Sequence, residues 1–272
     1  MKLTVPAHLD EGIWYPDTVD DDRRADTTWS HVARANAVRA AAATGGPDPF
    51  AKYPHWIRPY FVTLKGCVLD AGCGYGRVSI PLLRSNQTLR CVGVDASPVM
   101  LKKFVELSRE HCVQDRVELY CGNVSTLPFP DASFQSVLSC AVLLHNPKRE
   151  IEGIIGEFRR ILVDGGTLIL AGSFPNVLNP EGFTNLRNNF RATENGPVRA
   201  YTRSEVKKLF QTFTRVSVEA HQMLLLPRGV GSITLPWAGL SRALNRYLTE
   251  HWMNTFKHSA WFVNHHDVIA TK

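Results

Sequence analysis

The 272-residue sequence contains no apolar run long enough to cross a membrane and no signal-peptide pattern. Its six cysteines never occur as C-x-x-C, which argues against a zinc site or a redox pair of that kind. Lysine and arginine form no run, although the net charge is +6. We therefore expect a soluble, cytoplasmic protein that spans no membrane and does not bind nucleic acid.

The stretch V-L-D-A-G-C-G-Y-G-R, residues 68–77, carries the strongest signal. A short apolar strand ends at Asp70, and glycines follow at positions 72, 74 and 76. Glycine lets the backbone turn sharply and approach a ligand closely, because no Cβ intervenes. At the carboxyl end of a first parallel strand, such a turn forms a nucleotide-binding crevice.

A second apolar strand, residues 91–95, ends in the carboxylate of Asp95. It lies about 20 residues after the turn, where an acidic side chain can accept both hydroxyls of a ribose. The turn reads G-x-G-x-G, with Arg77 and Val78 where the G-x-G-x-x-G of dinucleotide-binding proteins needs its last glycine. Another kind of nucleotide-binding α/β protein remains the alternative.

With Asp70 before the turn, the stretch resembles the D-x-G-x-G-x-G motif of class I S-adenosylmethionine-dependent methyltransferases. Residues 122–134, with L-P-F-P-D inside them, are similar to a segment of the ubiquinone/menaquinone-type small-molecule methyltransferases. Asn123 and Gln135 depart from that group, which usually has Asp at both positions. We expect the Asn123 carbonyl oxygen to accept a hydrogen bond from an adenine amino group, and Gln135 to be structural.

The resemblance covers about residues 67–220 and implies S-adenosylmethionine as the cofactor. It implies that Asp70 holds the cofactor's ammonium and that Asp95 accepts the ribose hydroxyls. Backbone groups of the glycine turn would contact the methionine part, and Ala141 would lie under the sulfonium. The cofactor-binding residues implied by the resemblance are Asp70, Gly72, Cys73, Gly74, Gly76, Asp95, Ala96, Met100, Asn123, Val124 and Ala141.

Strands and helices alternate through five units after residue 66, which predicts a doubly wound, mostly parallel α/β sheet. The resemblance implies seven strands, of which the last, at about residues 261–270, is antiparallel and inserted between strands five and six. We expect residues 1–62 to form an N-terminal helical cap and residues 63–272 the methyltransferase core. Residues 226–257 should form a helical insertion between strands six and seven, either a lid over the pocket or a dimer interface.

His145 follows the fourth predicted strand, at the edge of the sheet where ligands bind in open α/β folds. Since imidazole titrates near neutral pH, His145 is the candidate general base; the alternative is that it only orders the loop. His265, His266 and Asp267 are adjacent in the sequence, but neighbouring strand residues point to opposite faces. We therefore predict no metal site there.

The expected reaction is in-line displacement of the cofactor's methyl group by an O or N atom of a small molecule. Aromatic residues in the expected cap and insertion favour a hydrophobic or aromatic acceptor. The alternatives are an RNA (tRNA) methyltransferase and a non-catalytic partner subunit with the methyltransferase fold. The sequence leaves open whether the protein is a monomer or a homodimer.

Overall fold

The computed structural model describes residues 3–17, 57–178, 190–193, 196–225, 229–230, 233–234, 236–256, 261 and 263–272. The chain divides into two compact units, which are described separately below. The first unit comprises Met1–Cys140, Gly153–Leu168 and Lys272, and the second comprises Ala141–Glu152 and Ile169–Thr271. Most of the expected cap, residues 18–56, lies outside the described residues.

Four parallel strands form the centre of the first unit. β3 pairs with β4 on one side and with β6 on the other, and β4 pairs with β5. Their apolar residues form continuous runs because helices cover both faces of a parallel sheet; Val68, Leu69, Val92 and Val94 are all fully or almost fully buried. The four strands are β3 (Cys67–Ala71), β4 (Arg90–Asp95), β5 (Val117–Cys121) and β6 (Phe134–Cys140).

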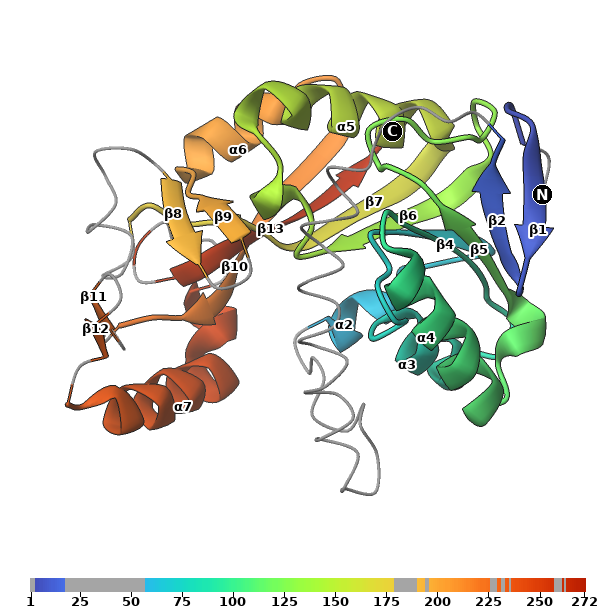
Figure 1. The fold of residues 1–272 in the computed structure, drawn as a ribbon. Coiled ribbons are helices and arrows are strands. Elements are labelled where there is room, and N and C mark those ends of the chain that lie inside the picture. Colours follow the sequence, from blue (N-terminus) through green and yellow to red (C-terminus); the bar gives the residue numbers. More distant parts are fainter. Residues whose placement is uncertain are drawn as a thin grey trace. The chain divides into compact units, whose positions relative to one another are not determined.

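Short helices connect these strands, and α3 and α4 pack against β4 and β5 (Figure 1). Gln135, at the start of β6, accepts a hydrogen bond from the Cys67 backbone N–H through its Oε1 atom at 3.2 Å, so it joins β6 to β3 as a structural residue. The helices of this region are α2 (Arg58–Phe61), α3 (Ser79–Ser85), α4 (Pro98–Glu110) and η1 (Gln114–Arg116).

The expectation of a helical cap is wrong for residues 7–16, which form two strands at the edge of the sheet. β1 (Ala7–Asp10) and β2 (Ile13–Pro16) pair antiparallel, and β2 pairs in parallel with β5. Glu11 and Gly12 join the strands with φ angles of 48° and 87°, the left-handed conformation that a two-residue hairpin turn of type I′ requires. Ile13 is fully buried, which ties the hairpin to the core.

The second unit contains the later strands of the sheet. β10 and β13 pair antiparallel, and β13 lies between β7 and β10. This confirms an antiparallel seventh strand inserted between strands five and six. The strands are β7 (Leu162–Pro175), which runs through both units, β8 (Phe190–Thr193), β9 (Gly196–Arg199), β10 (Arg215–Met223), β11 (Gly229–Val230), β12 (Ile233–Thr234) and β13 (Val263–Thr271).

Among the described residues the main sheet has nine strands, not the expected seven, in the order β1-β2-β5-β4-β3-β6-β7-β13-β10. The two additional strands are those of the N-terminal hairpin. Without them, seven strands remain, and the antiparallel β13 lies between β7 and β10, as the resemblance implies. The mostly parallel α/β fold is therefore confirmed.

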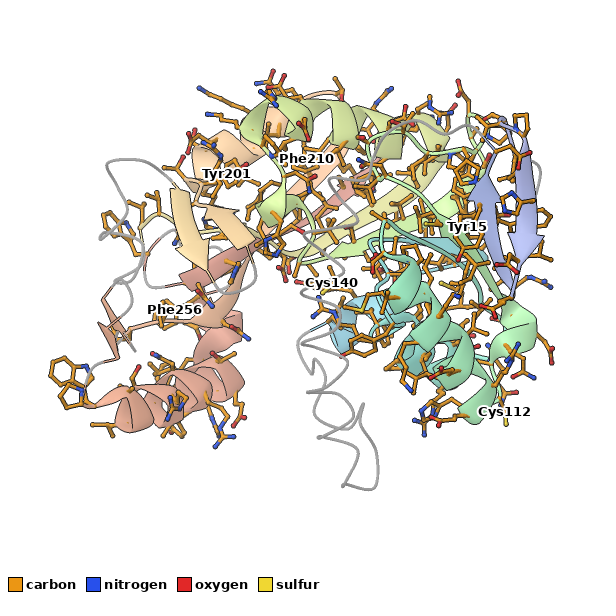
Figure 2. All side chains as sticks on the ribbon, viewed as in Figure 1. Tyr15, Cys112, Cys140, Tyr201, Phe210 and Phe256 are labelled. Carbon is orange, nitrogen blue, oxygen red and sulfur yellow. The ribbon has the colours of Figure 1, made fainter. Side chains whose placement is uncertain are left out.

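Helices complete the second unit. A capping box begins α6: the Thr202 side chain accepts from the Glu205 N–H, and Glu205 accepts from the Thr202 N–H. The Phe174 ring meets Tyr201 and Phe210 edge-on, at 5.3 and 6.0 Å between centroids; Figure 2 labels Tyr201 and Phe210. The helices are η2 (Leu143–His145), α5 (Lys148–Ile161, shared by both units), α6 (Arg203–Leu209) and α7 (Ala238–Phe256).

The expected insertion between strands six and seven contains one long helix, α7. This helix buries the polar residues Ser241 and Asn245 and exposes Leu240 and Tyr247. Its role as a lid or an interface stays a prediction. Among the helices of the described residues, none combines the length and the apolar character that crossing a membrane requires.

Candidate functional site

The glycine turn after β3 is held against the end of β4 by backbone hydrogen bonds. The N–H groups of Gly72 and Cys73 both donate to the Val94 carbonyl, at 2.7 and 3.0 Å. Gly72, Gly74 and Gly76 have φ angles of 79°, 54° and 82°, in the left-handed region that favours glycine. The predicted strand and turn are therefore present, and the turn lies at the carboxyl ends of β3 and β4.

Asp95, the last residue of β4, binds this turn through its side chain. Oδ2 accepts from the Gly74 N–H at 2.8 Å, and Oδ1 accepts from the Ser97 N–H at 2.9 Å. Ser97 in turn caps α4 by accepting from the Met100 N–H at 3.4 Å. One carboxylate thus joins the end of β4, the glycine turn and the start of α4.

Two glycines of the turn, Gly74 and Gly76, have different roles. A Cβ at Gly76 would lie 2.5 Å from the ring of Phe104, so Gly76 is needed for packing against α4. A Cβ at Gly74 would meet no atom of the described residues within 4 Å, so within this part of the chain Gly74 faces open space beside the Asp95 carboxylate. A ligand could therefore approach the backbone at Gly74, whereas the space beside Gly76 is filled by the Phe104 side chain.

This difference predicts a larger loss of stability for Gly76→Ala and a larger loss of ligand binding for Gly74→Ala. Gly76→Ala should lower the free energy of unfolding by about 3 kcal/mol, because overpacking adds to the strain of a positive φ. Gly74→Ala should lower it by only about 1 kcal/mol, from the φ strain alone, while a methyl group would obstruct ligand binding. Urea unfolding of both variants, with ligand titration of the folded protein, measures the two effects. Equal losses of stability would contradict this division of roles.

A further glycine, Gly93 in β4, makes room for Cys73. A Cβ at Gly93 would lie 2.8 Å from the Cys73 Sγ and 2.8 Å from Leu119 Cδ2. The Cys73 side chain is 2% exposed and points into the core. Of the predicted cofactor-binding residues, Cys73 can therefore offer its backbone to a ligand but not its thiol.

Asp70 is the second carboxylate of the site, and it is 1% exposed. The Ser79 hydroxyl, at the start of α3, donates to its Oδ2 atom, and the Cys91 thiol donates to the Ser79 hydroxyl at 3.2 Å. Burial raises the pKa of Asp70 to about 6, and the negative charge of Asp95 adds to this, while Ser79 and Arg77 oppose it. Asp70 therefore changes its charge near pH 6.

Burial also raises the pKa of Asp95, although the Ser97 and Gly74 N–H groups and the Arg77 charge lower it in part. Arg77 was not among the predicted site residues. It follows the last glycine of the turn, and its Nη2 donates to the Cys140 carbonyl at 3.0 Å, at the end of β6. The only sequence signal for it was its position directly after the motif.

The end of β5 brings Asn123 to the same edge. The Gly122 N–H donates to the Asp95 carbonyl at 3.0 Å, which aligns the ends of β4 and β5. The Asn123 Oδ1 accepts from the Ser125 N–H at 2.9 Å, so the oxygen expected to bind adenine also closes a local turn. Val124 is 7% exposed, and Ala96 and Met100 are half-buried near the start of α4.

Two predicted site residues, Ala141 and His145, belong to the second unit. Ala141 directly follows β6 and has a φ of 57°, unusual for a residue with a Cβ, and its N–H donates to the Ala171 carbonyl at 2.8 Å. Such conformations persist where the surrounding structure enforces them and are frequent at functional sites. His145 ends the short helix η2 and is half-buried.

Two carboxylates, a cation and an open backbone turn therefore lie at one edge of the first unit. Residues 68–166 match a protein family described as a methyltransferase domain. The chain is 32% identical over 117 residues to the sterol 24-C-methyltransferase of Eremothecium gossypii, covering 43% of this chain and 31% of that protein. It is 33% identical over 115 residues to the 27-O-demethylrifamycin SV methyltransferase of Amycolatopsis mediterranei, covering 42% and 41%.

The chain thus spans less than half the length of these curated relatives. A solved structure of a SAM-dependent methyltransferase from Archaeoglobus fulgidus has a TM-score of 0.53 at 17% identity, covering 79% of this chain and 91% of that one, and this likeness supports the fold. The family match falls on the region that contains the glycine turn and both carboxylates. Residues 68–166 therefore match a methyltransferase domain, and this match, together with the shared fold, indicates S-adenosylmethionine as the cofactor.

Proposed function

We propose that the protein transfers a methyl group from S-adenosylmethionine to an O or N atom of a small, hydrophobic or aromatic molecule. The observation that carries this proposal is the Asp95 carboxylate, hydrogen-bonded to the Gly74 N–H beside open space. A carboxylate fixed in this way presents its remaining lone pairs to the two hydroxyls of a ribose. The cofactor would supply an electrophilic methyl group on a sulfonium.

The residues of this chain would bind and orient that cofactor. Asp70 would hold the ammonium, the backbone at Gly72 and Gly74 would contact the methionine part, and Asn123 with Val124 would enclose the adenine. Methyl transfer from a sulfonium depends mainly on alignment of nucleophile, carbon and sulfur, so a rigid site is the principal requirement. Backbone hydrogen bonds from the turn to β4 provide such rigidity.

The acceptor class is inferred from relatives and composition. The names of the two relatives given above refer to a sterol and to a rifamycin. Both are small molecules with large apolar surfaces. Residues 225–261 expose large apolar side chains that could serve such an acceptor: Leu225, Trp237, Leu240, Tyr247, Trp252, Phe256 and Trp261. A likeness to the ubiquinone/menaquinone-type group stays a prediction from the L-P-F-P-D segment.

For an acceptor hydroxyl, we propose His145 as the general base. His145→Ala should then lower kcat about a hundredfold at neutral pH, because general-base catalysis contributes on that order. The affinity for S-adenosylhomocysteine should not change, since His145 has no role in holding the cofactor. Steady-state kinetics of the variant, once an acceptor is known, check this result. An unchanged kcat would leave His145 with a structural role only.

The first experiment is calorimetric titration of the purified protein with S-adenosylhomocysteine, with NADH as the control ligand. Saturable binding of S-adenosylhomocysteine alone is the expected result, and it would justify screening hydrophobic and aromatic acceptors. Binding of NADH alone would refute the cofactor assignment. Binding of neither ligand would favour a non-catalytic role for the fold.

A further inference from the structure

Arg77 joins the glycine turn to the end of β6. Its Nη2 donates to the Cys140 carbonyl at 3.0 Å and lies 3.8 Å from the Cys140 Sγ. Cys140 is 3% exposed and occupies the last position of β6 (Figure 2). The guanidinium therefore fixes the strand end that immediately precedes Ala141.

Arg77 is also the cation that acts on both carboxylates of the site. Its positive charge lowers the pKa of Asp70 and of Asp95, against the opposite effect of burial. Among the described residues, the other titratable groups nearby are the buried thiols of Cys73, Cys91 and Cys140. Burial raises the pKa of Cys73 and Cys91, so these two thiols stay uncharged at neutral pH. Among the described residues, the net charge at the turn therefore depends on the carboxylates of Asp70 and Asp95 and on the guanidinium of Arg77.

We propose that Arg77 is a positioning residue for cofactor binding: it holds the Cys140 carbonyl at the end of β6 and supplies a positive charge directly after the glycine turn. The inference rests on the proposed function, because it assigns Arg77 a role at the same cofactor site. Without a nearby cation, the buried Asp70 and the half-buried Asp95 would take up protons more readily. A protonated Asp70 could no longer pair with an ammonium, and a protonated Asp95 would be a weaker acceptor for ribose hydroxyls.

Two substitutions separate the charge of Arg77 from its hydrogen bond. Arg77→Gln keeps an N–H donor for the Cys140 carbonyl but removes the charge, whereas Arg77→Lys keeps the charge. Calorimetric titration with S-adenosylhomocysteine between pH 5.5 and 8.5 gives the pH at which affinity is half lost. In Arg77→Gln this midpoint should rise by about one pH unit, with affinity at pH 6 about tenfold weaker, since one pKa unit corresponds to a tenfold change. In Arg77→Lys the midpoint should stay where it is in the wild type.

Arg84, an exposed arginine of α3, provides the matched control, and Arg84→Gln should leave the pH profile unchanged. A merely structural role for Arg77 would weaken binding equally at every pH without moving the midpoint, and that result would overturn the inference. Thermal unfolding shows whether each variant is folded. If Arg77→Gln does not fold, Arg77→Lys decides alone, and a shift in the pH at which its affinity is half lost also overturns the inference. Failure of the wild-type protein to bind S-adenosylhomocysteine would instead refute the proposed function.

Discussion

Asp95→Ala is expected to weaken binding of S-adenosylhomocysteine about a hundredfold, since hydrogen bonds to a charged group contribute about 1.5–3 kcal/mol each. The carboxylate would accept both ribose hydroxyls, and alanine offers no acceptor in its place. The substitution also removes the acceptor of the Gly74 N–H, so the turn that contacts the methionine part loses its anchor. Both consequences weaken binding, and calorimetric titration measures their sum.

The same substitution should also destabilise the fold, by about 1–2 kcal/mol, because it removes hydrogen bonds to the Gly74 and Ser97 N–H groups. Ser97→Ala is the matched control. It removes the N-cap of α4, which costs about 1 kcal/mol, but leaves the Asp95 carboxylate in place. Ser97→Ala should therefore lose stability with little change in affinity. Wild-type affinity in Asp95→Ala would refute the assignment of Asp95 to the ribose.

Much of this site was predictable because its determinants are local in sequence. Glycines at alternate positions after an apolar strand predict the turn, and a serine followed by proline predicts the start of α4. The Thr202–Glu205 capping box likewise depends on residues three positions apart. The alternation of strands and helices then restricts the sheet to a parallel arrangement with the turn at its carboxyl edge.

The N-terminal hairpin shows where this reasoning fails. β1 and β2 have four residues each, and their turn, Glu11–Gly12, has glutamate where the type I′ turn usually has asparagine or aspartate. β1 (A-H-L-D) alternates between apolar and polar residues over only four positions, and β2 (I-W-Y-P) does not alternate. The hairpin is stabilised by its pairing with β5, and a pairing partner more than a hundred residues away leaves no mark in the local sequence.

Contacts distant in sequence also account for the residues that the motif missed or described incompletely. The contact of Arg77 with Cys140 spans 63 positions, and it follows from the register in which β3 pairs with β6. Gly93 appears as one residue of a strand, yet its missing side chain leaves space for Cys73. Gly76 matches the motif as a cofactor residue, but its nearest neighbour is Phe104 of α4. A sequence motif identifies such positions, but it does not distinguish residues needed for packing from residues that contact a ligand.

The ionisation of Asp70 links stability and cofactor binding in opposite directions. The pKa is about 6 in the folded protein against 3.8 for the ordinary carboxyl, so the folded state binds more protons between these values. The contribution of Asp70 to stability is therefore fully present below pH 3.8 and is lost as the pH rises through about 6. At pH 7 the folded protein keeps an ionised carboxylate buried, at a cost that a bound ammonium would offset.

Asp70→Asn should therefore stabilise the ligand-free protein at pH 7, by about 2–3 kcal/mol at 1.36 kcal/mol per pKa unit. The gain should disappear near pH 4, where Asp70 is neutral in the folded state. The neutral amide should also weaken S-adenosylhomocysteine binding about a hundredfold at pH 7. Wild-type affinity should fall as the pH drops below about 6, and the variant should lose that dependence. Urea unfolding and calorimetry at pH 4–8 measure both effects.

Ser79→Ala tests the same carboxyl without changing it. The Ser79 hydroxyl donates to Asp70 and lowers its pKa, so its removal should raise the pH at which affinity is half lost. Asp70→Asn and Ser79→Ala should thus act differently: the first abolishes the pH dependence and the second moves it to higher pH. If Asp70→Asn instead lowers stability at pH 7 while affinity stays at the wild-type level, Asp70 is a structural acceptor for Ser79 and the ammonium binds elsewhere. If Asp70→Asn is more stable than the wild type and binds S-adenosylhomocysteine weakly at every pH, Asp70 binds the ammonium. A packing defect would not both stabilise the fold and abolish the pH dependence of binding.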